Sequence, residues 1–386
     1  MRNNRIRVGL GLVIAIALGG CGSGSGNGSA SGNGSGSASG SGNGSGGGGG
    51  NGGGGGGGNG GGSAGGGGIG GGGGSAGGGA VLPPLGLVHY VTGNDADAEV
   101  VPSGPGLILM GGGTDVDAAF LWWKPLISGG DVVVLRTSGA DGYNDYLYTT
   151  IGGCDSVETL LVTSKQLAND PYVAYRVAHA EAVFMAGGDQ ADYANFWRGT
   201  AMADAIEAVW KRGGVVGGTS AGNAVLGEFF FGAYEGTVYS DEALKDPYNV
   251  FMTVDRDFFA FPPLKGFITD THFVPRDRMG RLVGFLGRIL TDGWAQSAKG
   301  IGVDEETAIV IDAAGKGEVL GVGKAYLVEA NAKPTLCSPG KALEYPGLLL
   351  HRLPPGSTLE FPSGTTAVPA EPLSASGGVL NIANPY

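Results

Sequence analysis

GVVGGTSAGNAV, residues 214–225, joins a short apolar run to a turn of small residues and the beginning of a helix-like pattern. Val215 and Val216 favour a buried strand, and the glycines beside Ser220 allow the sharp turn by which a strand runs into a helix. Residues 218–222 fit the pattern G-x-S-x-G, which exposes the serine hydroxyl on the turn and points helix N–H groups towards it. The stretch therefore predicts a nucleophilic serine at the carboxyl end of a parallel strand. A serine that merely caps the helix is the alternative interpretation.

The segments around this stretch alternate between apolar runs and helical patterns. Such alternation is typical of a parallel sheet that is covered by helices on both faces. We expect strands at 106–110, 131–135, 159–162, 182–185 and 214–217, and helices at 117–126, 141–148, 171–178 and 200–211. Strands at 302–303 and 307–311 follow, and the remaining tail, rich in Pro and Gly, should form antiparallel hairpins. The sequence predicts an α/β fold with a doubly wound, mostly parallel sheet and a β-rich C-terminal extension.

The N-terminal part of the chain has the layout of an export signal. Arg2, Arg5 and Arg7 precede the apolar run 8–18, which ends at Gly-Gly-Cys with Cys21. The end of this run resembles a bacterial lipobox, so we expect a lipoprotein signal peptide over residues 1–20 and a lipid on Cys21. A plain signal peptide and an uncut anchor are the alternatives. The expected location is the bacterial cell envelope, lipid-anchored, at the outer membrane or the extracellular face.

Residues 21–80 consist almost wholly of Gly, Ser, Asn and Ala. Nothing in this segment can bury apolar surface, so it predicts a disordered tether with a mean span of about 40 Å. The folded region is then expected over residues 81–386, which is within the range of one domain. A homodimer of this region is compatible with the sequence.

Charge and cysteine content exclude several classes of function. The chain carries 23 basic and 35 acidic residues, a net charge of −12, which argues against nucleic acid as a partner. Cys154 and Cys337 either form a disulfide or remain free thiols. Because the chain has no CxxC and no Cys/His cluster, we expect no metal and no cofactor.

A nucleophilic serine needs a base, and the chain has four histidines, at 89, 179, 272 and 351. His272 follows the apolar pair 267–268, and a strand ending there would bring it to the same edge as Ser220. The third group should be a carboxylate that orients the imidazole. Eight carboxylates lie between the two residues, and spacing does not choose among Glu228, Glu235, Asp241, Glu242, Asp246, Asp255, Asp257 and Asp270.

Three arginines follow the histidine, at 276, 278 and 281. Guanidinium groups bind carboxylates with two parallel hydrogen bonds, so Arg276, Arg278 and Arg281 could bind an acidic substrate. The alternative is a solvated basic helix face that pairs with local acids such as those at 304–306.

Taken together, four segments resemble the cyanophycinase branch of the dipeptidase E-like serine peptidases. The segments are AGGDQ at 186–190, GGTSAGNAV at 217–225, DTHFVPRDRMGRL at 270–282 and GVDEETA at 302–308. The resemblance covers roughly residues 105–325 and implies a sheet like that of class I glutamine amidotransferases. Thr271 and Asn223 depart from the family's usual Gln and Ala.

The resemblance also implies roles for residues. It implies a Ser-His-Glu site in which Ser220 is the nucleophile, His272 the base and Glu242 the acid, with Asp241 as the second choice. The loop with Gly188, Asp189 and Gln190 should line the site, with the N–H groups of Gly188 and Ala221 as oxyanion donors. The three arginines should contact an acidic substrate.

The expected function is therefore that of a serine exopeptidase-type hydrolase that cleaves cyanophycin or a related acidic or β-linked peptide through an acyl-enzyme. Two alternatives stay open: a catalytically silent surface-binding lipoprotein on the same scaffold, and an amidase or esterase with the same triad.

Overall fold

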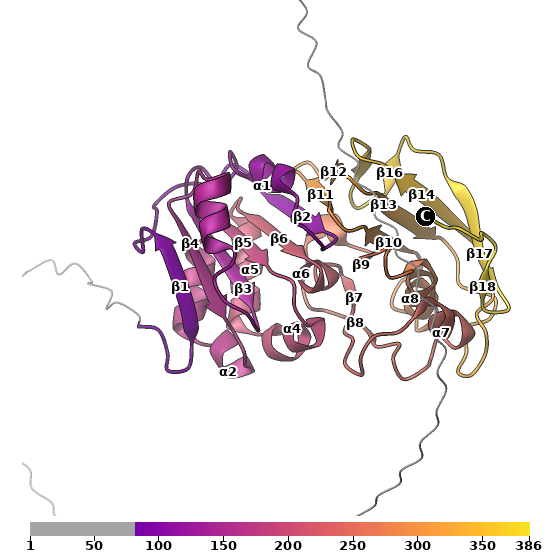
Figure 1. Cartoon of the computed structure of the whole chain (residues 1–386). Coiled ribbons are helices and arrows are strands. Elements are labelled where there is room, and N and C mark those ends of the chain that lie inside the picture. The colour runs from indigo at the N-terminus through magenta and orange to yellow at the C-terminus, as the bar shows by residue number, and fades with distance from the viewer. Residues whose placement is uncertain (1–81) are drawn as a thin grey trace, which may run out of the picture. The chain divides into compact units, whose positions relative to one another are not determined.

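The computed structural model describes residues 82–386 (Figure 1). The expected signal peptide, the lipid attachment at Cys21 and the tether at 21–80 lie outside the described residues, as does Val81. Within residues 82–386, no helix combines the length and the apolar character needed to cross a bilayer.

The strands of the first sheet surround a parallel centre. Five neighbouring strands, β4-β3-β5-β6-β2, run parallel, and antiparallel strands extend the sheet on both sides in the order β1-β4-β3-β5-β6-β2-β11-β12-β15-β16. The central strands are mainly apolar and almost entirely buried, because both faces of the sheet are covered. The ten strands are β1 (Val88–Gly93), β2 (Gly106–Met110), β3 (Asp131–Arg136), β4 (Ser156–Leu161), β5 (Ala182–Met185), β6 (Val215–Thr219), β11 (Thr307–Ile311), β12 (Lys316–Gly321), β15 (Thr358–Glu360) and β16 (Thr365–Thr366).

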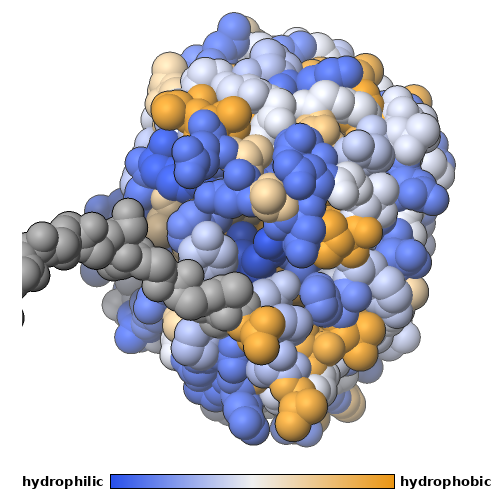
Figure 2. All heavy atoms as spheres, turned by 90° about the vertical axis from the view of Figure 1, so that its left-hand side faces the viewer, coloured by the Kyte–Doolittle hydropathy of each residue, from blue (hydrophilic) through white to orange (hydrophobic). Residues whose placement is uncertain are grey.

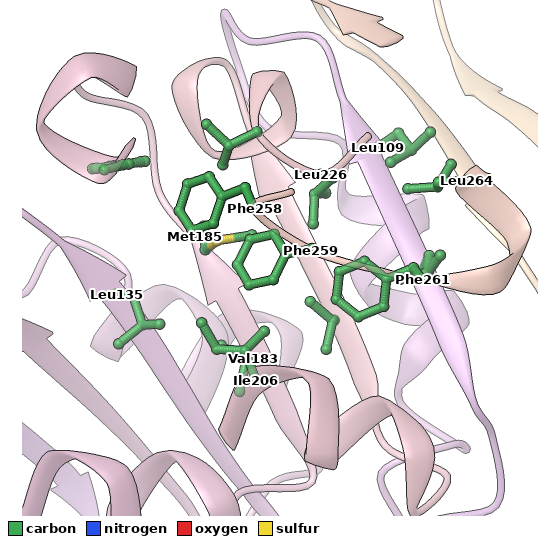
Figure 3. Close-up of a cluster of buried hydrophobic side chains, with 14 of the residues drawn as sticks. Leu109, Leu135, Val183, Met185, Ile206, Leu226, Phe258, Phe259, Phe261 and Leu264 are labelled. Atoms are coloured by element: carbon green, nitrogen blue, oxygen red, sulfur yellow. The ribbon is translucent and has the colours of Figure 1, made fainter. Parts of the chain in front are cut away.

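Helices cover this sheet on both faces. One face packs on α1 (Asp117–Trp123) and the π-helix η1 (Tyr146–Ile151), with Phe120 and Trp123 against Phe184 of β5. The other face packs on the helices α2 (Lys165–Ala168), α3 (Pro171–His179), α4 (Gln190–Trp197) and α5 (Ala201–Lys211). There the buried rings of Phe258, Phe259 and Phe261 lie over the sheet, near Met185 and Val183 (Figure 3). Two buried layers thus hold the parallel strands, as a doubly wound sheet requires.

A second sheet of eight strands has its own core. Its order is β18-β17-β14-β13-β10-β9-β7-β8, and helix α8 packs its apolar side into a cluster with Phe231, Phe273 and Tyr326. The bounds are β7 (Phe229–Phe231), β8 (Val254–Arg256), β9 (Phe267–Asp270), β10 (Ala298–Val303), β13 (Ala325–Ala330), β14 (Tyr345–Leu353), β17 (Glu371–Ser376) and β18 (Val379–Leu380), with α6 (Ala221–Ala224), α7 (Ser240–Lys245), the 3-10 turn η2 (Pro262–Leu264) and α8 (Met279–Thr291).

The structure confirms the expected α/β class and its β-rich C-terminal part. The hairpins of that part divide between the two sheets, and β9, which precedes His272, belongs to the second sheet rather than to the sheet that carries Ser220. The helix expected at 141–148 is displaced to the π-helix at 146–151, and the strand expected at 159–162 begins earlier, at Ser156. Cys154 and Cys337 are free thiols. The face beside β1 is mostly hydrophilic, with scattered hydrophobic residues (Figure 2).

Candidate active site

Ser220 lies on the turn between β6 and α6. Its backbone has φ 51° and ψ −117°, a conformation that L-residues rarely adopt. The Ser220 N–H donates to the Met110 carbonyl of the neighbouring strand β2 at 3.2 Å, and its own carbonyl accepts from the Ala224 N–H at 2.9 Å. Hydrogen bonds on both sides therefore hold the strained turn in place.

The two glycines of the G-x-S-x-G pattern are needed because backbone surrounds them. A Cβ at Gly218 would lie 2.5 Å from the carbonyl carbon of Gly222. A Cβ at Gly222 would lie 2.1 Å from the carbonyl oxygen of Met185, at the end of β5. The pattern thus reflects the close packing of the turn against the neighbouring strand.

His272 meets this serine from the second sheet. Its Nε2 lies 2.7 Å from Ser220 Oγ, its N–H donates to the Gly111 carbonyl at 2.8 Å, and its φ is 45°. The imidazole ring lies directly on Gly112, where a Cβ would come within 2.4 Å of Cε1. The glycine run 111–113 after β2 therefore leaves room for the imidazole ring to pack on the backbone. The sequence analysis did not assign this role to the run.

The carboxylate at the other side of the imidazole is Glu305. Its Oε1 lies 2.6 Å from His272 Nδ1. The expectation of Glu242 is corrected: its Oε2 accepts from the Tyr239 N–H at 3.0 Å and closes a capping box at the start of α7. Asp241, the second choice, is exposed and pairs with Lys245.

The position of Glu305 explains why it was missed. It lies in the turn between β10 and β11, after the histidine in the chain, whereas the acid was sought between Ser220 and His272. The sequence offers the acidic run 304–306 as partners for the arginines instead. A signal for Glu305 was available in the sheet that carries the histidine. Because β10 pairs in parallel with β9, the turn after β10 lies at the same edge as His272, which follows β9.

The remaining histidines have other partners. His89 is bound to Glu158 at 2.8 Å, His179 to the Tyr175 carbonyl at 2.9 Å, and His351 to the Val368 carbonyl at 2.7 Å. Only His272 among them contacts a hydroxyl nucleophile in the part of the chain described here.

Burial keeps the imidazole of His272 neutral. Burial lowers its pKa below the usual value, and the charges of Arg276 and Arg278 lower it further. The hydrogen bond to Glu305 raises the pKa but does not outweigh these effects. A neutral imidazole with its proton on Nδ1 can accept the Ser220 proton at Nε2.

The pH profile of hydrolysis should show this shift. Because only the neutral imidazole acts as base, kcat/KM is expected to fall as the pH drops through the lowered pKa, with a midpoint below about 6.5. The profile can be measured with a peptide whose own groups do not titrate between pH 4 and 8. A midpoint above the usual histidine pKa would contradict the assignment.

The loop after β5 lies beside Ser220. A Cβ at Gly187 would come 3.6 Å from the Ser220 Cβ, so the loop passes directly beside the nucleophile. Asp189 caps α4 by accepting from the Ala191 N–H at 2.9 Å, and both Asp189 and Gln190 line the adjoining pocket. The N–H groups of Gly188 and Ala221 as oxyanion donors stay a prediction.

The three arginines after His272 fall into two kinds. Arg281 makes two hydrogen bonds to Asp270, at 2.8 and 2.5 Å, and Arg278 lies 3.4 Å from the same carboxylate. Both guanidinium groups and Asp270 are buried. Arg276 is exposed and has no carboxylate partner among residues 82–386. The solvated-face interpretation therefore fails for Arg278 and Arg281, and their partner is Asp270 rather than the acids at 304–306.

One buried carboxylate faces two buried guanidinium groups, so this cluster keeps an excess positive charge. Burial lowers the pKa of Arg278 to about 10, and the neighbouring arginines lower it as well. Burial alone would raise the pKa of Asp270, but Arg281 and Arg278 hold it below its usual value. The cluster thus presents net positive charge to the pocket.

Replacing Asp270 by asparagine should destabilise the protein by about 3 to 5 kcal/mol, because two buried guanidinium groups would lose their counter-charge. Urea unfolding measures the loss. The matched control is Asp241→Asn, which alters an exposed pair and should leave the transition nearly unchanged. Equal transitions for the two variants would show that the buried pairs contribute little.

A pocket of about 540 Å³ opens beside these groups. Its wall on one side comes from the segment after β7. The lining residues are Asp189, Gln190, Ala233, Gly236, Thr237, Val238, Tyr239, Pro275, Arg276, Arg278 and Arg281. All five expected side chains of the substrate site (two from the β5 loop and the three arginines) therefore meet in one cavity.

The two departures from the family pattern both make structural contacts. Asn223 donates to the Met110 carbonyl at 3.1 Å and accepts through its own carbonyl from Thr269 at 2.7 Å, which ties β2 to β9. The Thr271 carbonyl accepts from Arg278 at 2.7 Å. Asn223 thus helps to join the sheet of the serine to the sheet of the histidine, whereas the Thr271 contact lies within the segment between β9 and α8. No group of three or more His, Cys, Asp or Glu side chains able to hold a metal occurs within residues 82–386.

A serine on a strained strand-to-helix turn, in hydrogen-bond contact with a histidine that a carboxylate orients, is the arrangement found in serine hydrolases with an α/β fold. Residues 140–316 match the family model of Peptidase family S51. Over this segment, which contains Ser220, His272 and Glu305, the chain is similar to this family of serine-type peptidases.

Curated relatives are also similar to part of this chain. A cyanophycinase of Synechococcus elongatus is 28% identical over 179 residues, which cover 46% of this chain and 50% of that protein. A cyanophycinase of Geminocystis herdmanii is 29% identical over 202 residues, 52% of this chain and 68% of that protein. The chain thus spans about half the length of the first of these relatives.

Two solved structures are also similar. A peptidase from an acI-B1 Actinobacterium aligns with a TM-score of 0.46 and 18% identity over 66% of this chain and 96% of that chain. A putative peptidase E protein from Listeria monocytogenes aligns with a TM-score of 0.36 and 15% identity over 57% of this chain and all of that chain, 100%.

Proposed function

We propose that this protein is a serine exopeptidase-type hydrolase that cleaves cyanophycin or a related acidic or β-linked peptide. The observation that carries the proposal is the unbroken contact series from Ser220 Oγ through both nitrogens of His272 to Glu305, at 2.7 and 2.6 Å, beside a pocket with excess positive charge. A scaffold that served only for binding would not need this arrangement.

The contacts support a two-step reaction. Ser220 Oγ attacks the peptide carbonyl while His272 Nε2 takes its proton, and Glu305 accepts from Nδ1–H and stabilises the imidazolium. His272 then protonates the leaving amine, which departs and leaves an acyl-enzyme on Ser220. Water attacks this ester with His272 again as base, which releases the acid product and restores the serine. The N–H groups of Gly188 and Ala221 would stabilise the oxyanion.

The charge of the pocket supports an anionic substrate. Arg276 can form two hydrogen bonds to a carboxylate without giving up an internal partner. Arg278 and Arg281 add positive charge to the wall of the pocket, because their two guanidinium groups share the single carboxylate of Asp270. Cyanophycin, a poly-aspartate backbone with arginine on its side chains, supplies carboxylates of this kind, and the relatives named above are cyanophycinases.

We also propose that the protein is lipid-anchored through Cys21 at the bacterial cell envelope, on the outer membrane or the extracellular face, and acts on external polymer. Radiolabelled fatty acid should enter the wild-type chain and not the Cys21→Ser variant. Equal labelling of both chains would contradict the anchor.

The substrate proposal is tested by incubating the protein with purified cyanophycin and identifying aspartyl-arginine dipeptides by mass spectrometry. A fluorophosphonate probe that reacts with Ser220 is applied in parallel. Dipeptide release supports the proposal. Labelling without release, together with cleavage of simple amides or esters, would favour an amidase or esterase, and a folded protein that is not labelled would favour the silent binding protein.

A further inference from the structure

The segment that follows β18 returns to the loop that carries the arginines. The ring of Tyr386 packs edge-on against Phe273 and Tyr326, with centroid distances of 5.9 and 5.8 Å. Its hydroxyl accepts from the Met279 N–H at 3.0 Å and donates to Asp277 Oδ1 at 2.7 Å. The Tyr386 side chain therefore contacts the loop at Phe273, Asp277 and Met279. The C-terminal end of the chain is marked C in Figure 1.

The contacted residues are neighbours of His272 and of the arginines in the chain. Phe273 directly follows His272, Asp277 stands between Arg276 and Arg278, and Met279 begins α8. Asp277 has φ 46°, a conformation that needs external support in a residue with a side chain. On the other side of the loop, Ser240 is hydrogen-bonded to the Asp277 carbonyl and to the Arg281 N–H.

The tail around Tyr386 is itself anchored. Arg352 of β14 donates to the carbonyls of Pro385 and Asn384, at 3.1 and 3.3 Å, and forms an ion pair with Glu371. The Tyr386 N–H donates to Asn384 Oδ1 at 3.1 Å. Burial and the hydrogen bond to Asp277 raise the pKa of the Tyr386 hydroxyl, so it stays protonated and able to donate.

We infer that Tyr386 is a positioning residue of the substrate pocket, which holds the loop 273–279 so that Arg276 faces the bound anion. This inference rests on the proposed function. It assigns a part in substrate binding to a segment that lies beyond residues 140–316, the part of the chain that matches the family. The β-rich extension is then a component of the site as well as of the fold.

Tyr386→Phe removes the hydroxyl and keeps the ring, which makes it the sharpest variant. The matched control is Tyr345→Phe in β14, whose hydroxyl donates to the Ala332 carbonyl at 3.0 Å and does not touch the loop. Three quantities are measured in the full chain: KM and kcat for cyanophycin, the rate of Ser220 labelling by an uncharged fluorophosphonate, and hydrogen exchange of residues 273–279.

For Tyr386→Phe we expect KM to rise roughly three- to tenfold, with kcat and the labelling rate nearly unchanged, because the triad does not depend on this hydroxyl. The Met279 amide should exchange faster, since it loses its acceptor. Tyr345→Phe should leave all three quantities as they are. A KM change of equal size in both variants would reduce Tyr386 to a general stabilising residue.

The positioning role of Tyr386 can be tested even if cyanophycin is not the substrate. If the wild-type chain is labelled but releases no dipeptide, the substrate proposal fails, and the positioning role is then decided by protection of Ser220 from labelling by oligo-aspartate and by the exchange data. Unchanged exchange at 273–279 in Tyr386→Phe would overturn the inference in either case.

Discussion

Replacing Ser220 by alanine is expected to lower kcat for peptide hydrolysis by roughly 10⁴- to 10⁶-fold, because no other group in the site can form the acyl-enzyme. His272 Nε2 would then face a methyl group instead of the hydroxyl at 2.7 Å. Substrate binding should persist, since the arginines and the β5 loop are untouched. Stopped assays with cyanophycin over many hours measure the loss, and labelling by a fluorophosphonate should vanish.

The fold should survive this change, because Ser220 Oγ supports no structural contact apart from that to His272. The turn is held by backbone hydrogen bonds to Met110 and Ala224, which alanine retains. Ser363→Ala, in an exposed turn of the tail, serves as a control that should keep full activity. Turnover at the wild-type rate in Ser220→Ala would rule out the assignment of the nucleophile.

Replacing Glu305 by glutamine is expected to lower kcat by roughly 10²- to 10⁴-fold. The amide nitrogen of glutamine can donate to His272 Nδ1, which moves the imidazole proton to Nε2, where it blocks acceptance of the serine proton. KM should change little, because Glu305 does not line the substrate pocket. Initial-rate measurements over a range of substrate concentrations separate the two constants.

Glu242→Gln is the matched comparison. Its carboxylate caps α7, and glutamine can accept the same hydrogen bond from the Tyr239 N–H, so both stability and kcat should stay close to wild type. A large loss of kcat in Glu242→Gln, with normal turnover in Glu305→Gln, would reverse the assignment that the structure supports.

Assigning the acid to Glu305 instead of Glu242 also changes the order of the three site residues along the chain. The order is serine, histidine, acid, whereas the acid was expected between the other two. A carboxylate needs only to reach Nδ1 in space, and a turn between two strands can supply it from any point of the sequence. The ion pair of the arginines was missed for a similar reason, since Asp270 is close to them only through the turn between β9 and α8.

Local features of the sequence were sufficient for the main architecture. The continuously apolar runs that became β2, β3 and β5 can be buried only between two layers of helices, so their pattern predicted the parallel sheet. The shift of one helix to the π-helix at 146–151 had no such signal in the sequence. Its Leu147 and Ile151 lie in the buried cluster that also contains Phe184 and residues of α1.

The turn at Ser220 was determined by the sequence itself, because only glycines fit where the Met185 and Gly222 carbonyls approach within about 2 to 3 Å of a would-be Cβ. Which side chains complete the site was decided by tertiary structure alone. Two sheets meet where the Gly111 carbonyl accepts from the His272 N–H, and Glu305 reaches the imidazole from the turn between β10 and β11. Tyr386 reaches the arginine loop within the second sheet and its core. Strand and turn propensities act over a few residues, whereas Glu305 is 33 residues from His272 and Tyr386 is 109 residues from Asp277.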